Sequence, residues 1–234
     1  TAALLPSVVA DIGGQDLYAW VATAYLIAAV NASMLVSRAL TWWGQRGAYV
    51  VAFAAFGVGV AITAVTPTMP LLVAGRAVQG IGGGLLAGLG YAVIRSTLPP
   101  SLWVKAAALI SAMWGVGALV GPGVGGLFAE LDAWRWAFAL LVVASVGLIG
   151  VAVRNIPART EAATRSGEGF PIASLALLTG AAAAFSVGST LTDLRAVVGC
   201  LVAGAVALAA FLLADARARA TVTRRSSSFH GLRM

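Results

Sequence analysis

Seven stretches of mostly apolar residues recur along the chain and decide which class of protein it can form. Each is close to the length of about 20 residues that a helix needs to cross a lipid bilayer. They occupy residues 17–36, 48–65, 71–94, 106–128, 135–153, 172–191 and 196–214. The chain is 60% hydrophobic and 10% charged, whereas soluble domains carry roughly 25% charged residues. We therefore predict an all-α integral membrane protein, with eight crossings if the apolar opening segment is the end of a truncated first helix.

The distribution of basic residues predicts the orientation of these helices. If the loop at residues 11–16 faces outside, twelve Lys and Arg residues fall in inside segments and two, Arg135 and Arg195, fall outside. Excess positive charge marks the cytoplasmic side of a membrane protein. We expect a multi-pass protein of the plasma or inner membrane, with cytoplasmic loops at residues 37–47, 95–105 and 154–171 and a cytoplasmic C-terminal tail. The net charge of +7 is thus explained by the basic residues of the inside segments. We expect the lipid bilayer rather than nucleic acid as the partner.

Composition along the chain predicts four regions. Residues 1–153 form an N-terminal transmembrane bundle of six helices, the first of them truncated. Residues 154–171 are polar and rich in turn-forming residues, which predicts a cytoplasmic loop. Residues 172–214 form an additional transmembrane hairpin of helices seven and eight, and residues 215–234 form a basic surface or disordered tail.

One full charge, Arg76, lies inside a predicted span. A cation within the hydrocarbon layer is costly and indicates a functional site. Gln79 and Gly83 follow at i+3 and i+7, so the three residues share one helix face. This face is suited to lining a cavity, and we expect Arg76 and Gln79 to line it or to relay protons. The alternative is that Arg76 extends to the membrane interface and carries no function.

Polar residues in the second span are weaker candidates. Tyr25 and Asn31 are candidate substrate-lining residues, although single polar residues in membrane helices more often hydrogen-bond to neighbouring helices.

Glycine recurs every four residues in the segment GVGALVGPGVGG, at Gly117, Gly121 and Gly125. The three form one stripe without side chains, which lets another helix approach closely. Pro122 lacks an N–H and collides with the preceding turn, so we expect the helix to bend there.

The combination Gly117-x-x-x-Gly121-Pro122-x-x-Gly125-Gly126 resembles the antiporter motif on the fifth helix of drug:H+ antiporters, which belong to the major facilitator superfamily. LLVAGRAVQGIGGG is similar to the fourth-helix motif of the family. ALLPSVVADIGG, LYAWVATAYLIAA and DAWRWAF resemble its first, second and sixth helices, in family order. The resemblance implies the N-terminal six-helix bundle of that superfamily. The following hairpin is similar to the two helices that the fourteen-helix multidrug exporter branch inserts between its halves.

The loop SRALTWWGQRG matches the family's loop between helices two and three only in part. Gly44 and Arg46 fit the pattern, so we interpret them as a remnant of the inner-gate loop. Ser37 and Thr41 replace a Gly and an Asp of the family, and that Asp takes part in the inner gate.

Two further features separate the chain from a complete antiporter. Proton coupling needs an embedded carboxyl group, yet no predicted span contains Asp or Glu. The C-terminal half that the family uses for alternating access is also missing. We therefore expect a fragment of a longer transporter, whose partners would be its C-terminal half, protons and the substrate.

The resemblance implies proton-coupled export of hydrophobic or cationic drug-like compounds. Export of a metabolite or sugar is one alternative, and a non-transporting remnant or structural membrane protein is another. We predict no enzyme, no catalytic residue, no metal and no cofactor, because His230 lies in the basic tail and Cys200 stands alone in an apolar span.

Overall fold

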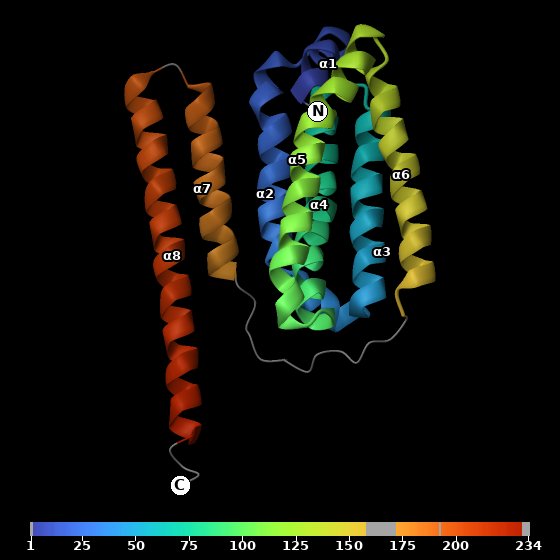
Figure 1. The fold of residues 1–234 in the computed structure, drawn as a ribbon. Helices are drawn as coiled ribbons and strands as arrows, with labels where there is room; N and C mark the ends of the chain where they lie inside the picture. The colour runs from blue at the N-terminus through green and yellow to red at the C-terminus, as the bar shows by residue number, and fades with distance from the viewer. Residues whose placement is uncertain (1, 158–171, 192, 231–234) are drawn as a thin grey trace. The chain divides into compact units, whose positions relative to one another are not determined.

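A computed structural model describes residues 2–157, 172–191 and 193–230, and every regular element in these ranges is a helix (Figure 1). The chain forms two compact units, Thr1–Arg165 and Ser166–Met234. Five helices among the described residues are long and apolar enough to cross a membrane. These observations confirm the predicted all-α membrane class.

The first unit contains six α-helices joined by short connections. Their order is η1 (Ala2–Leu4), α1 (Leu5–Ile12), η2 (Gln15–Leu17), α2 (Tyr18–Ser33), α3 (Val36–Val65), α4 (Met69–Thr97), α5 (Pro100–Glu130) and α6 (Trp134–Asn155). Among the described residues, five of the eight predicted crossings have both the length and the hydropathy of a membrane span: α3, α4, α5, α6 and the first part of α8. The helix α2 has 16 residues and falls short, because the chain turns at Met34 and Leu35.

The predicted loop at residues 37–47 is not a loop in the structure. It lies within α3, which is helical except at Gly44, where φ is 64° and ψ is −179°. A residue with a side chain rarely adopts this conformation, so the break falls at the glycine. The segment before it stays helical because Val36 and Ala39 are buried against Leu85 and Leu89 of α4.

The predicted loop at residues 95–105 is also much shorter than expected. The helix α4 continues to Thr97, and α5 begins at Pro100, where the missing N–H of proline costs no helical hydrogen bond. The indole Nε1 of Trp103 donates to the carbonyl of Leu98 at 2.9 Å and closes the turn. The charged residues in this segment therefore lie within the ends of α4 and α5 rather than in an irregular loop.

The helix α4 is packed between α2 and α3, and glycines lie at its closest backbone contacts. An added Cβ at Gly80 would lie 2.3 Å from the carbonyl oxygen of Tyr25, and one at Gly82 would lie 2.3 Å from the backbone nitrogen of Phe56. Glycine is thus required at both positions, because a side chain there would keep the backbones of α2 and α3 from coming so close to α4. Because α4 lies between α2 and α3, its polar side chains can contact either of these two helices.

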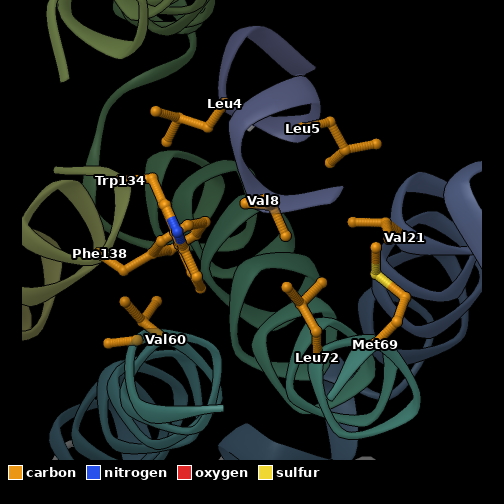
Figure 2. Packing of buried hydrophobic residues seen from close by; sticks show 10 residues of the cluster. Leu4, Leu5, Val8, Val21, Val60, Met69, Leu72, Trp134 and Phe138 are labelled. Atoms are coloured by element: carbon orange, nitrogen blue, oxygen red, sulfur yellow. The ribbon is translucent and has the colours of Figure 1, made fainter. Parts of the chain in front are cut away.

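Two apolar clusters fill the ends of the first unit. The larger cluster joins α1, α2, α3, α4 and α6, and Figure 2 shows Val8 and Leu72 between the rings of Trp134 and Phe138 and the side chain of Met69. The smaller cluster joins α2, α3 and α4. Together they pack α2 against α4 at both ends of the first unit.

The second unit is a hairpin of α7 (Ile172–Thr190) and α8 (Leu194–His230). Near the turn, an added Cβ at Gly188 would lie 3.1 Å from the Cβ of Cys200, so the two helices are in close contact there. The helix α8 continues to His230, so residues 215–230 of the predicted basic tail are helical rather than disordered. Most of the predicted loop, residues 158–171, lies outside the described residues.

Candidate functional site

Arg76 lies in the interior of the first unit, seven residues after the start of α4, and only 7% of it is exposed. Its Nε donates a hydrogen bond to the carbonyl oxygen of Val21 in α2 at 3.2 Å. Its Nη1 donates to Oε1 of Gln79, one turn further along α4, at 2.5 Å. The guanidinium is therefore directed toward α2 within the bundle. It does not extend away from the bundle into solvent.

Tyr25 of α2 completes the surroundings of this charge. The Cζ atom of Arg76 lies 4.4 Å from the centroid of the Tyr25 ring, which is a cation–π contact. The hydroxyl end of the ring is packed against Gly83, where an added Cβ would lie 2.5 Å from the Tyr25 oxygen. The ring is thus held between Arg76 and Gly83.

These contacts depend on the close approach of α2 and α4. An added Cβ at Gly84 would lie 2.0 Å from the carbonyl oxygen of Ala29, in direct conflict with the α2 backbone. Because glycine removes this conflict, the α2 backbone comes near enough for Arg76 to reach the carbonyl of Val21. The glycines of α4 therefore allow the polar contacts that α4 makes with α2.

The ring of Tyr25 forms part of the wall of a cleft of ≈ 720 Å³ between α2, α4 and α5. The α4 side contributes Gly83, Leu86, Ala87 and Gly90. The α5 side contributes Ile110, Met113, Trp114, Gly117 and Ala118. Met113 is 66% exposed and Trp114 is 63% exposed, so the cleft is open along α5. A mostly apolar cleft with one oriented polar group is typical of a small-molecule site.

The predicted glycine stripe of α5 is only partly in contact with the rest of the unit. Gly117 lines the cleft. Among the described residues, an added Cβ at Gly121 or Gly126 would meet no atom within 4 Å, whereas one at Gly125 would lie 3.4 Å from the Cβ of Ala3. Pro122 is exposed, and α5 continues through it without interruption. Close packing of this stripe is therefore seen here only at Gly125.

Three other candidates lie away from the cleft lining. Nδ2 of Asn31 donates to the carbonyl of Ile27, one turn earlier in the same helix, at 2.9 Å. Gly44 forms the break in α3, and Arg46 is half-buried just after it. The structure thus brings Arg76, Gln79, Tyr25 and Gly117 to one region, and leaves Asn31, Gly44 and Arg46 elsewhere.

A second polar cluster joins the ends of α1, α3 and α6. Arg135 forms an ion pair with Asp11, which lies in the last turn of α1 rather than in a loop as predicted. Arg135 also donates to the carbonyl of Thr66 at 3.2 Å, and the indole Nε1 of Trp134 donates to Asp11 at 3.2 Å. Hydrogen bonds from Arg135 and then Trp134 hold the pKa of Asp11 below its ordinary value. This cluster fixes α1 to α6.

Met113 and Trp114 were not among the residues we expected at the site. The signal is present in the sequence, because the α5 lining residues recur at i, i+3, i+4, i+7 and i+8 from Ile110. This spacing defines one face of a helix. In a span that is apolar on all sides, however, such a pattern does not show which face lines a cleft.

Comparison with known proteins shows which family the chain resembles. A family model described as Major Facilitator Superfamily matches residues 1–213. A probable multidrug-efflux transporter of Mycobacterium tuberculosis (strain H37Rv) is 46% identical over 95% of the chain and 48% of the relative. Efflux pump FUS6 of Gibberella fujikuroi is 32% identical over 63% of the chain and 27% of the pump. Multidrug resistance protein 3 of Bacillus subtilis is 28% identical over 60% of the chain and 28% of that protein. The chain spans about half the length of the first of these relatives, at 48%.

Proposed function

The chain belongs to the major facilitator superfamily, and we propose that it provides the N-terminal transmembrane bundle of a proton-coupled exporter of hydrophobic or cationic drug-like compounds. The observation that carries this proposal is the cleft of ≈ 720 Å³ between α2, α4 and α5. Its volume is within the range of about 300–1,000 Å³ that drug-sized ligands occupy. The names of the relatives, which include multidrug-efflux transporters, support the same substrate class.

In this proposal Arg76 has a structural and a functional role. Its hydrogen bond to Val21 holds α2 against α4, its hydrogen bond to Gln79 within α4 orients the guanidinium, and its contact with Tyr25 orients one wall of the cleft. A movement of α2 relative to α4 during transport would change the contacts of Arg76 with Val21 and Tyr25 together. A buried charge with several partners is suited to such coupling, because losing one partner is costly.

The lining of the cleft favours a hydrophobic substrate over a sugar or polar metabolite. The Tyr25 hydroxyl and the indole N–H of Trp114 are the polar side-chain groups among the ten described lining residues. A sugar site needs several hydrogen-bond partners, because a desolvated hydroxyl without a partner loses free energy. Competition between a transported dye and candidate sugars would separate the two alternatives, and sugar inhibition of dye efflux would contradict our proposal.

Efflux measured in cells that express the natural gene tests the function directly. We expect proton-driven efflux of a hydrophobic dye by the wild type, its loss in Arg76→Ala, and partial retention in Arg76→Lys, which keeps the charge but loses the planar donor geometry. Membrane insertion of both variants is the control. Absence of efflux by the inserted wild type would support the alternative of a non-transporting membrane protein. Unchanged efflux by Arg76→Ala would contradict the role of Arg76.

A further inference from the structure

The α4 wall of the cleft carries few side chains. Its lining residues recur at i, i+3, i+4 and i+7 and so form one face of the helix: Gly83, Leu86, Ala87 and Gly90. Two of the four have no side chain, and Ala87 has a single methyl group. A wall of this kind has little relief, so a planar group can lie against it over most of its area.

The walls that α4 and α5 form diverge from a point of contact. An added Cβ at Gly90 would lie 3.5 Å from Cδ1 of Ile110, so the two helices touch there. They run in opposite directions from the turn at residues 98–99 and rise equally per residue, which places Gly117 at the height of Gly83. At Gly117 an added Cβ would meet none of the described atoms within 4 Å. The cleft is therefore wedge-shaped, and a thin group can enter it more deeply than a globular one.

Trp114 lies on the α5 wall between these two ends. By the same register it is level with Leu86 and Ala87, and 63% of the residue is exposed. The face of an indole attracts other rings in offset-stacked or edge-to-face arrangements. A flat ring system in the wedge would contact the indole on one side and the α4 wall on the other. A globular group would be held away from one of the two surfaces, and dispersion contacts weaken steeply across such a gap.

We propose that Trp114 determines the specificity of the cleft by stacking on flat fused-ring compounds, which lie between its indole and the α4 wall. This inference rests on the proposed function, in which the cleft is the substrate site, and it narrows the substrate class by shape. Charge is not part of this selection, because the face of an indole stacks on neutral rings and also binds cations.

Equilibrium binding to the full chain in lipid nanodiscs tests the selection with two uncharged probes. The probes are 2-naphthalenemethanol, which is flat, and 1-adamantanemethanol, which is globular and has the same number of carbon atoms and the same hydroxymethyl group. Empty nanodiscs correct for partition into lipid. We expect the flat probe to bind at least about fivefold more tightly, as one aromatic contact adds to apolar burial. Equal binding, tighter binding of the globular probe, or no binding of either would overturn the inference.

Variants of Trp114 then test whether the indole causes the preference. Because the residue is mostly exposed, replacing it displaces few packed atoms. We expect Trp114→Leu to bring the two affinities within about twofold of each other, and Trp114→Phe to keep part of the preference because it keeps a smaller ring. Trp136→Leu is the matched control, since Trp136 of α6 is 71% exposed and does not line the cleft. An unchanged preference in Trp114→Leu, or a preference lost equally in Trp136→Leu, would contradict the inference.

Efflux in cells that express the natural gene separates this inference from the proposed function. We expect Trp114→Leu to raise the KM for a flat fused-ring dye by at least about fivefold while the wild type exports it. An unchanged KM in a variant that still exports the dye would overturn the role of Trp114 and leave the proposed transport intact. Absence of efflux by the wild type, together with the expected binding preference, would contradict only transport.

Discussion

At the scale of single residues, Arg76 places a buried positive charge in contact with a backbone carbonyl of a neighbouring helix. Its burial is tolerated because a carbonyl of α2, the Gln79 amide and the Tyr25 ring surround the guanidinium. Asp11 and Arg135 form a different kind of contact, an exposed ion pair that connects α1 to α6. The two arginines thus differ in what they stabilise. Arg76 fixes the wall of the cleft, and Arg135 fixes the ends of helices.

The lowered pKa of Asp11 predicts how the Asp11–Arg135 contact depends on pH. The ionised carboxylate contributes stability at pH values above the ordinary Asp pKa of about 4, and this contribution is lost as the pH falls through the lowered pKa. We expect the melting temperature of the wild type in detergent to exceed that of Asp11→Asn at neutral pH. The difference should shrink below about pH 4.

Asp16→Asn is the matched control, because Asp16 is an exposed carboxylate in η2. Its melting temperature should follow that of the wild type across the same range. A difference between wild type and Asp11→Asn that stays constant into the acid range would show that the contact does not depend on ionisation.

At the scale of elements, the glycines of α4 and α5 serve different purposes. Those of α4 lie against the backbones of α2 and α3 within this chain, as at Gly80, Gly82 and Gly84. At Gly121 and Gly126 of α5, an added Cβ would meet none of the described residues within 4 Å. We interpret the first set as required for folding and the second set as available for contact with a further part of a transporter.

Two substitutions on α4 test the folding role. In Gly84→Ala the new Cβ would lie 2.0 Å from the carbonyl oxygen of Ala29, so α2 and α4 must separate. We expect a loss of about 1–3 kcal/mol in stability, as for other overpacked sites. In Gly90→Ala the nearest atom is Cδ1 of Ile110 at 3.5 Å, an ordinary contact. This control should be neutral or gain up to about 1 kcal/mol in helix propensity. Equal thermal stability of the two variants would contradict the packing that the structure shows.

Substitution of the α5 stripe separates folding from transport. Because an added Cβ at Gly121 meets no atom of the described residues within 4 Å, Gly121→Leu should insert and melt like the wild type. We expect it to lose more than about 90% of efflux, since a bulky side chain prevents close helix approach. Gly147→Leu on α6, which is equally free of neighbours, should retain efflux. Wild-type efflux by Gly121→Leu would show that no close contact forms there.

At the scale of the whole molecule, the orientation in the membrane remains a prediction from the charge distribution. Cysteines introduced at Asp16 and Ser101, in a background with Cys200→Ser, would report the two sides. We expect an impermeant maleimide to label position 16 from outside intact cells and position 101 only in inverted vesicles. Labelling of position 101 from outside would reverse the topology.

Most of the fold follows from the sequence, because length and hydropathy are sufficient to place membrane helices. The ends of α3 and α5 were misplaced for a physical reason. Charged residues such as Arg46 and Lys105 mark where a chain leaves the lipid, but they do not end a helix. Asp11 was likewise placed in a loop, although it occupies the last turn of α1.

The site could be predicted only in part. Arg76 and Gln79 stand out because a membrane helix rarely carries them. The face formed by Met113 and Trp114 does not stand out, because all faces of α5 are apolar. Which face lines the cleft depends on the crossing of α4 and α5, and this is a tertiary property. The cation–π contact of Tyr25 also depends on the approach of α2 to the glycines of α4.

The central claim is that the exported compound occupies the cleft between α2, α4 and α5. Protection of single cysteines against maleimide in membrane vesicles tests it most directly, with Ala118→Cys inside the cleft and Leu119→Cys, which is 82% exposed, beside it. Both variants carry Cys200→Ser. We predict that a transported compound slows labelling of position 118 by at least about fivefold and leaves position 119 unchanged, as expected for a ligand that buries most of its surface in the cleft. Equal labelling rates at position 118 with and without a compound that is demonstrably transported would contradict the account.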